Sequence, residues 1–149
     1  MNTVLDLKNI SKHFIINKGL KNIFSQQKEK FIAVDKVNLK LESKKVLGLV
    51  GESGSGKSTC GLMAMRLLNP SSGNIILENN NITTLKNYEL KSYRKKMQII
   101  FQDSYSSLNP MMTLAQIIIE PFVIHNLHTL NERQELAKEL LNKVGLDKT

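Results

Sequence analysis

The sequence has no tryptophan and only one cysteine, Cys60, among its 149 residues. A single cysteine cannot form a disulfide within the chain, which agrees with a reducing compartment. The longest apolar runs, Val46 to Val50 and Ile117 to Ile119, fall far short of the roughly 20 residues that a membrane-spanning helix needs. The amino end also lacks the basic and then apolar pattern of a secretory signal. We therefore expect a cytosolic protein.

Aromatic residues are scarce, at 5% of the chain, and this bears on the meaning of the net charge of +8. The lysines and arginines are dispersed, and no aromatic residues interleave with a basic stripe as they do on nucleic-acid stacking surfaces. We therefore expect a solvated basic surface and no nucleic-acid partner. Anionic lipid headgroups or a partner protein stay open as alternatives.

One segment carries most of the chemical information in the chain. Residues 51 to 58 fit the pattern G-x-x-x-x-G-K-[ST] between an apolar run and an amphipathic stretch. Glycines let the backbone fold around a phosphate chain with its N–H groups pointing inward, and the following helix adds its positive dipole end. The predicted phosphate site consists of Gly51, Glu52, Ser53, Gly54, Ser55, Gly56, Lys57, Ser58 and Thr59.

Two residues of this loop have individual predicted roles. Lys57 is expected to reach the β- and γ-phosphates as a mobile point charge. The hydroxyl of Ser58 is expected to be a ligand of the Mg²⁺ ion that bridges those phosphates. The loop therefore predicts a binding site for a nucleoside triphosphate.

The first half of the chain predicts strands around this loop. Leu5 to Phe14 alternates loosely, and residues 37 to 42 alternate cleanly, as a half-exposed antiparallel strand does. The unbroken apolar run Val46 to Val50 predicts a buried strand that leads into the phosphate loop. Asn74 to Leu77 and Ile82 to Leu85 predict two further short strands.

Helical patterns alternate with one more strand after the loop. We expect a helix from Thr59 to Leu68, a short basic helix from Tyr88 to Lys96, and a buried strand from Met97 to Phe101.

Two helices are expected near the carboxyl end. The first has Thr113 as its N-cap, runs to about His125, and is broken or kinked at Pro121. The second has Asn131 as a possible N-cap and Gly145 just after its end.

These motifs together resemble the ATP-binding subunits of ABC transporters. The likeness lies in Phe14, the phosphate loop, the run Leu68 to Gly73 and, above all, the stretch IFQDSYSSLNP at residues 100 to 110. That stretch, the residues MMTLAQIIIEPF after it and the polar segment at residues 17 to 30 resemble the subgroup that powers oligopeptide, dipeptide and nickel or metallophore import.

The resemblance covers essentially the whole chain and implies its fold. The implied fold is an α/β P-loop NTPase, an ABC-type nucleotide-binding domain with an antiparallel β-subdomain that is incomplete at the carboxyl end. Residues 1 to about 102 would form the β-subdomain and P-loop core, and residues from about 103 to 149 the start of the helical subdomain.

The resemblance also implies roles for two residues outside the loop. Phe14 would stack on the adenine ring, although a core phenylalanine at a strand end stays open as the alternative. Gln102 would join Ser58 in coordinating Mg²⁺ and would orient the attacking water. The implied cofactors are ATP and Mg²⁺. The implied partners are a second ABC ATPase subunit and transmembrane permease subunits, with the protein peripheral on the cytoplasmic face of the cell membrane.

Several motifs that the family needs for hydrolysis do not occur in the 149 residues. These are a Leu-Ser-Gly-Gly-Gln type signature, an apolar strand ending in Asp-Glu, and a switch histidine. Glu120 follows three isoleucines, but no aspartate precedes it, Pro121 follows it, and the segment is predicted to be helical. His125 and His128 lack a third metal ligand, so we interpret them as a solvated pair or a pair at a helix end.

We therefore assign no catalytic residue. The expected function is ATP binding by the amino-terminal part of a longer subunit, in which hydrolysis energises import of peptides or a related small solute. We expect the chain alone to hydrolyse ATP poorly or not at all.

Two alternatives remain at this point. A small P-loop kinase or GTPase-like switch would use Asp103 as its Mg²⁺-side carboxylate, but residues 142 to 145 supply no Asn-Lys-x-Asp motif and arginines are few. A non-catalytic fragment that binds partners without turnover is the other alternative.

Overall fold

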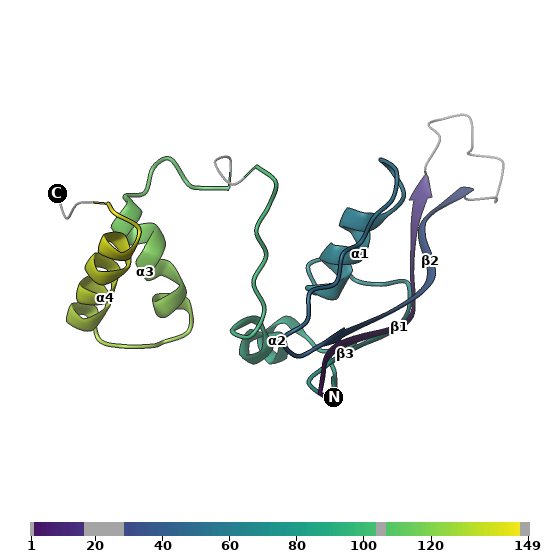
Figure 1. Ribbon diagram of the computed structural model, residues 1–149, viewed down its shortest axis with the longest axis horizontal. Coiled ribbons are helices and arrows are strands. Elements are labelled where there is room, and N and C mark those ends of the chain that lie inside the picture. The colour runs from purple at the N-terminus through teal and green to yellow at the C-terminus, as the bar shows by residue number, and fades with distance from the viewer. Residues whose placement is uncertain (1, 17–28, 104–106, 147–149) are drawn as a thin grey trace. The chain divides into compact units, whose positions relative to one another are not determined.

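The computed structural model describes residues 2–16, 29–103 and 107–146, and it divides the chain into two compact units, Met1–Gln98 and Ile99–Thr149 (Figure 1). Most of the polar segment at residues 17 to 30, and residues 104 to 106 of the stretch after Phe101, lie outside the described residues.

The first unit is organised around an antiparallel sheet of four strands in the order β2-β1-β3-β4 (Figure 1). Its strands are β1 (Thr3–Ile16), β2 (Glu29–Glu42), β3 (Ser72–Leu77) and β4 (Asn80–Asn81). Leu7 of β1 pairs with Leu39 of β2 on one side and with Ile75 of β3 on the other. The expected antiparallel sheet is confirmed.

The core of the first unit lies between the sheet and two helices, α1 (Lys57–Ala64) and α2 (Asn87–Arg94). Alternate apolar residues of the strands point inward, and each helix adds the residues of one stripe. The buried core residues are Leu7, Ile10, Val34, Cys60, Met63, Ile75, Leu77, Ile82 and Leu90.

Helix α1 ends at Ala64, four residues before the predicted end at Leu68. Arg66 has a left-handed φ of 53°, and its buried guanidinium turns toward the segment after β4. Its Nε donates to the carbonyl of Ile82 at 2.9 Å and one terminal nitrogen donates to the carbonyl of Leu85 at 3.1 Å. Burial lowers the pKa of this guanidinium, and the nearby charge of Arg94 lowers it further.

The same contacts explain why the strand predicted at Ile82 to Leu85 is wrong. These residues form a turn after β4, and their carbonyls accept hydrogen bonds from Arg66 where a strand would accept them from a neighbouring strand.

The two buried strands predicted at Val46 to Val50 and at Met97 to Phe101 are also wrong. Neither segment is a strand, and Val46 is 100% exposed while Ile100 is 86% exposed. A buried strand forms only where neighbouring strands supply its hydrogen bonds and other elements cover both of its faces. Among the described residues, no strand pairs with either segment.

The second unit contains a pair of helices, α3 (Leu114–Ile124) and α4 (Leu130–Lys143). Thr113 is the N-cap of α3, as predicted: its hydroxyl accepts from the backbone nitrogen of Gln116 at 3.2 Å. Gln116 returns the bond by accepting from the backbone nitrogen of Thr113 at 2.8 Å. The helix continues through Pro121 without a break.

The N-cap of α4 is Thr129, so the prediction of Asn131 is wrong. A capping box between Thr129 and Glu132 begins the helix two residues earlier. Gly145 lies just after the end of α4 with φ 75°, as predicted. Its backbone nitrogen donates to the carbonyl of Asn142 and that of Leu146 to the carbonyl of Leu141, which is a Schellman end.

Within the part of the chain that the structure describes, no helix combines the length and the apolar character needed to cross a membrane.

Candidate functional site

The predicted phosphate loop connects the exposed segment at residues 46 to 50 to the start of α1. Gly54 and Gly56 have φ values of 81° and 90°, in the left-handed region that glycine adopts without steric strain. The backbone nitrogen of Ser55 donates to the carbonyl of Glu52 at 3.2 Å, which closes the turn. The loop therefore curls back on itself just before α1 begins.

Gly56 also marks a close approach between the loop and strand β2. A Cβ atom at this position would lie 2.3 Å from the carbonyl oxygen of Ala33, and L residues rarely adopt a φ of 90°. Gly56 is the N-cap of α1, so the backbone N–H groups of the first helical turn have no partner within the helix. The loop thus lies directly before the end of α1 whose N–H groups and dipole are suited to an anion.

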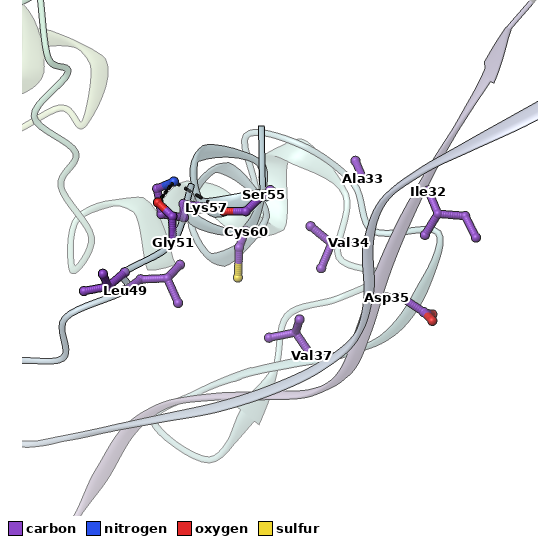
Figure 2. A pocket seen from close by; sticks show the side chains of 12 residues that line it. Ile32, Ala33, Val34, Asp35, Val37, Leu49, Gly51, Ser55, Lys57 and Cys60 are labelled. Atoms are coloured by element: carbon purple, nitrogen blue, oxygen red, sulfur yellow. Dashed lines mark hydrogen bonds between the residues drawn. The ribbon is translucent and has the colours of Figure 1, made fainter. Parts of the chain in front are cut away.

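The ammonium group of Lys57 is held by the loop itself. Its Nζ donates to the carbonyl of Gly51 at 2.7 Å and to the hydroxyl of Ser55 at 3.3 Å (Figure 2). It also donates to the carbonyl of Glu52 at 2.5 Å. A lysine ammonium has three donors and no acceptor, so these contacts set its direction. The positive charge of Lys57 is therefore held against the loop.

A cavity of about 310 Å³ lies between the loop and β2 (Figure 2). Val34 and Val37 of β2 point toward Cys60 and Leu49 in this view. The residues that line the cavity are Ile32, Ala33, Val34, Asp35, Val37, Leu49, Val50, Gly51, Ser55, Gly56, Lys57 and Cys60. The cavity is at the lower end of the size range of small-molecule pockets, with an apolar wall on β2 and polar groups at the loop.

Phe14, predicted to stack on adenine, lies on β1 opposite Phe31 of β2 and is 40% exposed. It is not among the residues that line the cavity, although Ile32, the residue after Phe31, is. The Nζ atom of Lys12 lies 5.2 Å from the centre of the Phe14 ring. Sequence reasoning missed Lys12, and its i, i+2 spacing from an aromatic residue on a strand is the signal that would have found it.

The two predicted Mg²⁺ ligands lie in different units. Ser58 is exposed on the first turn of α1, next to Lys57, while Gln102 is an exposed residue of the unit Ile99–Thr149. The described residues contain no group of three or more His, Cys, Asp or Glu side chains that could hold a metal ion. The Ser58 hydroxyl is the type of oxygen ligand that Mg²⁺ accepts when a nucleotide's phosphates supply others.

Three further residues named from the sequence lie in or beside helices. Glu120 is exposed on helix α3, where the sequence predicted a helix. The ring of His128 packs edge-on against Phe122, with centroids 5.6 Å apart. Cys60 is buried in α1, as expected for a small apolar side chain, and burial raises the pKa of its thiol.

Comparison with known families gives one clear match. The model of the family described as "ABC transporter" matches residues 34–149. The oligopeptide transport ATP-binding protein AppF of Bacillus subtilis is 45% identical over 145 residues, which cover 97% of this chain and 43% of AppF. The oligopeptide transport ATP-binding protein OppF of the same organism is 40% identical over 147 residues, or 97% of this chain and 45% of OppF.

Among solved structures, the chain is similar to a dimeric ATP-binding cassette, MJ0796, in a post-hydrolysis state bound to ADP and Pi. The TM-score is 0.75 with 26% sequence identity, and the match covers 97% of this chain and 58% of the cassette. The chain thus spans less than half the length of the two transport proteins and somewhat more than half of the cassette.

Proposed function

The chain belongs to the ABC transporter family, and from that premise we propose that it is the nucleotide-binding part of an ATP-binding subunit that energises the import of peptides. The two relatives described above are named as oligopeptide transport ATP-binding proteins, and this supports the choice of cargo class. The family match over residues 34–149 does not favour the kinase or GTPase alternative based on Asp103.

The conformation of Lys57 is the observation that carries this proposal. Two loop carbonyls and one hydroxyl hold its ammonium over the curled loop, beside the N-terminal end of α1. Phosphate oxygens would replace the longest of these contacts, to Ser55, and would also accept from the backbone N–H groups of the first helical turn. The chain therefore supplies both a fixed charge and directed donors to a triphosphate.

We propose that the adenine base and Mg²⁺ contact one residue of this loop and two residues outside it. Phe14 offers a planar apolar ring for adenine, at the edge of the wall that β2 forms. A bound Mg²⁺ would supply neutralisation of the phosphate charge. Ser58 is its proposed ligand in the first unit, and Gln102 is the proposed ligand in the second.

We further propose that the 149-residue chain binds ATP but does not turn it over. The sequence holds neither the Leu-Ser-Gly-Gly-Gln type signature nor an Asp-Glu strand end, and Glu120 lies on a helix. In the whole protein, two ATP-binding subunits would close on each other and act on transmembrane permease subunits at the cytoplasmic face of the membrane. The dimeric state of the similar cassette supports the pairing of subunits.

Calorimetric titration of the chain with Mg-ATP tests the binding proposal. We expect saturable binding that Lys57→Ala weakens by about ten- to a hundredfold, since a hydrogen bond to a charged group contributes roughly 1.5–3 kcal/mol. Lys91→Ala is the matched control, because it removes an equal charge from an exposed position on α2. Equal affinity of the Lys57→Ala and unmodified chains would refute the proposal, and phosphate release by the chain would refute the claim of no turnover.

A further inference from the structure

We propose that Lys12 is a positioning residue that fixes the ring of Phe14 for stacking on the adenine of bound nucleotide. This inference rests on the proposed function, because it assigns a role within the same ATP site. Lys12 does not itself contact the phosphate loop in the structure; it acts through the ring.

The first observation is the place of the Lys12 ammonium. It lies 5.2 Å from the centre of the Phe14 ring, within the range of an attractive cation–π contact. The same nitrogen donates to the backbone carbonyl of Asn69 at 2.8 Å. The ammonium is therefore held between the ring and the chain segment that follows α1.

The second observation is that Asn69 is itself fixed. One terminal nitrogen of Arg66 donates to the side-chain oxygen of Asn69. Arg66 is only 7% exposed, and its other nitrogens donate to the carbonyls of Ile82 and Leu85. A continuous series of contacts thus runs from a buried arginine through Asn69 and Lys12 to the aromatic ring.

The ring at the end of this series is accessible. Phe14 is 40% exposed. The residue that pairs with it on the neighbouring strand β2 is Phe31, which is 51% exposed. An exposed phenylalanine samples several ring orientations, and stacking on a base selects one of them. A cation held against the ring by Asn69 reduces that choice before the base arrives, and pre-ordering of this kind raises affinity.

Two other roles for Lys12 lead to different measurable results. A direct contact with phosphate would make Lys12 matter for any polyphosphate, with or without a base. A purely structural tie between β1 and the Asn69 segment would lower the stability of the first unit and would not distinguish ligands. A positioning role affects only ligands that carry a base.

The test compares ATP with inorganic tripolyphosphate, both as Mg²⁺ complexes, in titrations of the full 149-residue chain. Lys12→Met keeps most of the aliphatic side chain and removes the cation. We expect it to weaken ATP binding by about two- to fivefold, the range that follows from an exposed cation–π contact, and to leave tripolyphosphate binding unchanged. Lys12→Arg should restore the affinity for ATP, because a guanidinium also binds aromatic faces.

Two further variants complete the design. Phe14→Ala should weaken ATP binding and not tripolyphosphate binding, and Lys12→Met should add nothing on that background, because the ring through which Lys12 acts is gone. Lys8→Met is the matched control: Lys8 is on the same strand and pairs with Asp6 at 3.7 Å, so the variant removes an equal charge away from the ring. We expect it to leave both affinities unchanged.

Three results would overturn the inference: an equal loss of tripolyphosphate affinity in Lys12→Met, full additivity of the Lys12 and Phe14 substitutions, or no loss of ATP affinity at all. Failure of the proposed function would give different results from failure of this inference. It would show as no ATP binding by the unmodified chain, or as no effect of Lys57→Ala, whereas the three results above leave the binding of ATP at the phosphate loop intact.

Discussion

The two units of the chain bury their apolar residues to very different extents. In the first unit, β1, β2 and β3 and helices α1 and α2 enclose a core whose members include Ile10 and Ile75, both 0% exposed. In the second unit, Ala137 is the only buried hydrophobic residue among those that the structure describes, and Val123 and Ile124 of α3 are about half exposed.

This difference follows from what each kind of element needs. Antiparallel strands supply one another's hydrogen bonds, and two short helices suffice to cover one face of such a sheet. A pair of helices has only one shared face, so the remaining apolar residues of α3 and α4 stay at the surface. We therefore expect the first unit to be the more stable of the two. The first two predictions below compare matched positions in both units, and the third concerns a helix start in the second unit.

The largest expected effect comes from matched isoleucines. Ile75→Ala, at a fully buried position of β3, should reduce the stability of the first unit by about 2–5 kcal/mol, because it leaves a cavity in a closed core. Ile124→Ala, at a position 52% exposed in α3, should change the stability of the second unit by about 0.5 kcal/mol or less. Amide hydrogen exchange followed residue by residue measures both units in one chain.

The unmodified chain provides the baseline for this comparison. Amides of β1 and β3 should exchange more slowly than those of α3 and α4. Equal losses of stability from Ile75→Ala and Ile124→Ala would show that the second unit has a core that the described contacts do not reveal. Slower amide exchange in α3 and α4 than in β1 and β3 would show the same.

Matched glycines give the next largest effect. At Gly73, with φ 89°, a Cβ atom would lie 2.4 Å from the carbonyl oxygen of Asn9, so Gly73→Ala strains the backbone and also forces β1 and β3 apart. At Gly145, with φ 75°, a Cβ atom would meet nothing within 4 Å. We expect a loss of about 2 kcal/mol or more for Gly73→Ala, from the strain of a left-handed alanine plus the clash, and about 1 kcal/mol for Gly145→Ala.

Urea denaturation followed by circular dichroism and hydrogen exchange together measure these losses. If Gly73→Ala cost no more than Gly145→Ala, the close approach between β1 and the start of β3 would have to relax without energetic consequence.

In both units, the correct predictions are those with local causes. The alternation in residues 37 to 42 and the cap at Thr113 were predicted correctly, because their causes are local: a period of two residues, and a side chain that bonds its own helix end. The phosphate loop is predicted from its residue spacing and from the apolar and amphipathic stretches on either side of it. Gly54 and Gly56 of this segment have left-handed φ values.

The errors have non-local causes. The runs at Val46 to Val50 and Met97 to Phe101 have the composition of buried strands, but a strand requires partners, and the described residues provide none for them. Helix α1 ends early because Arg66 bonds carbonyls sixteen and nineteen residues away, which no local pattern encodes. The contact between Lys12 and Asn69 joins residues that are 57 positions apart, which is farther still.

The smallest expected effect is a dependence of the stability of the first turn of α4 on pH. The carboxylate of Glu132 accepts from the backbone nitrogen of Thr129 at 2.7 Å and from its hydroxyl at 2.9 Å. These two hydrogen bonds, the backbone one foremost, lower the pKa of Glu132, and the nearby His128 adds a smaller effect in the same direction. A glutamate whose folded pKa is lowered stabilises the folded helix above its unfolded pKa of about 4.3, and this contribution is lost as the pH falls through the folded pKa.

An NMR titration of the Glu132 carboxyl and of the Thr129 amide should therefore give a common pKa below about 4.3, with the first turn of α4 losing exchange protection over the same pH range. Glu132→Gln keeps an oxygen acceptor but does not ionise, so its helix start should show no such acid transition. Thr129→Ala keeps the backbone donor and removes the hydroxyl, so the pKa of Glu132 should rise only part of the way toward its usual value. The backbone hydrogen bond is the larger cause of the lowered pKa. If Thr129→Ala returned the pKa of Glu132 fully to its usual value, the hydroxyl would be the larger cause instead.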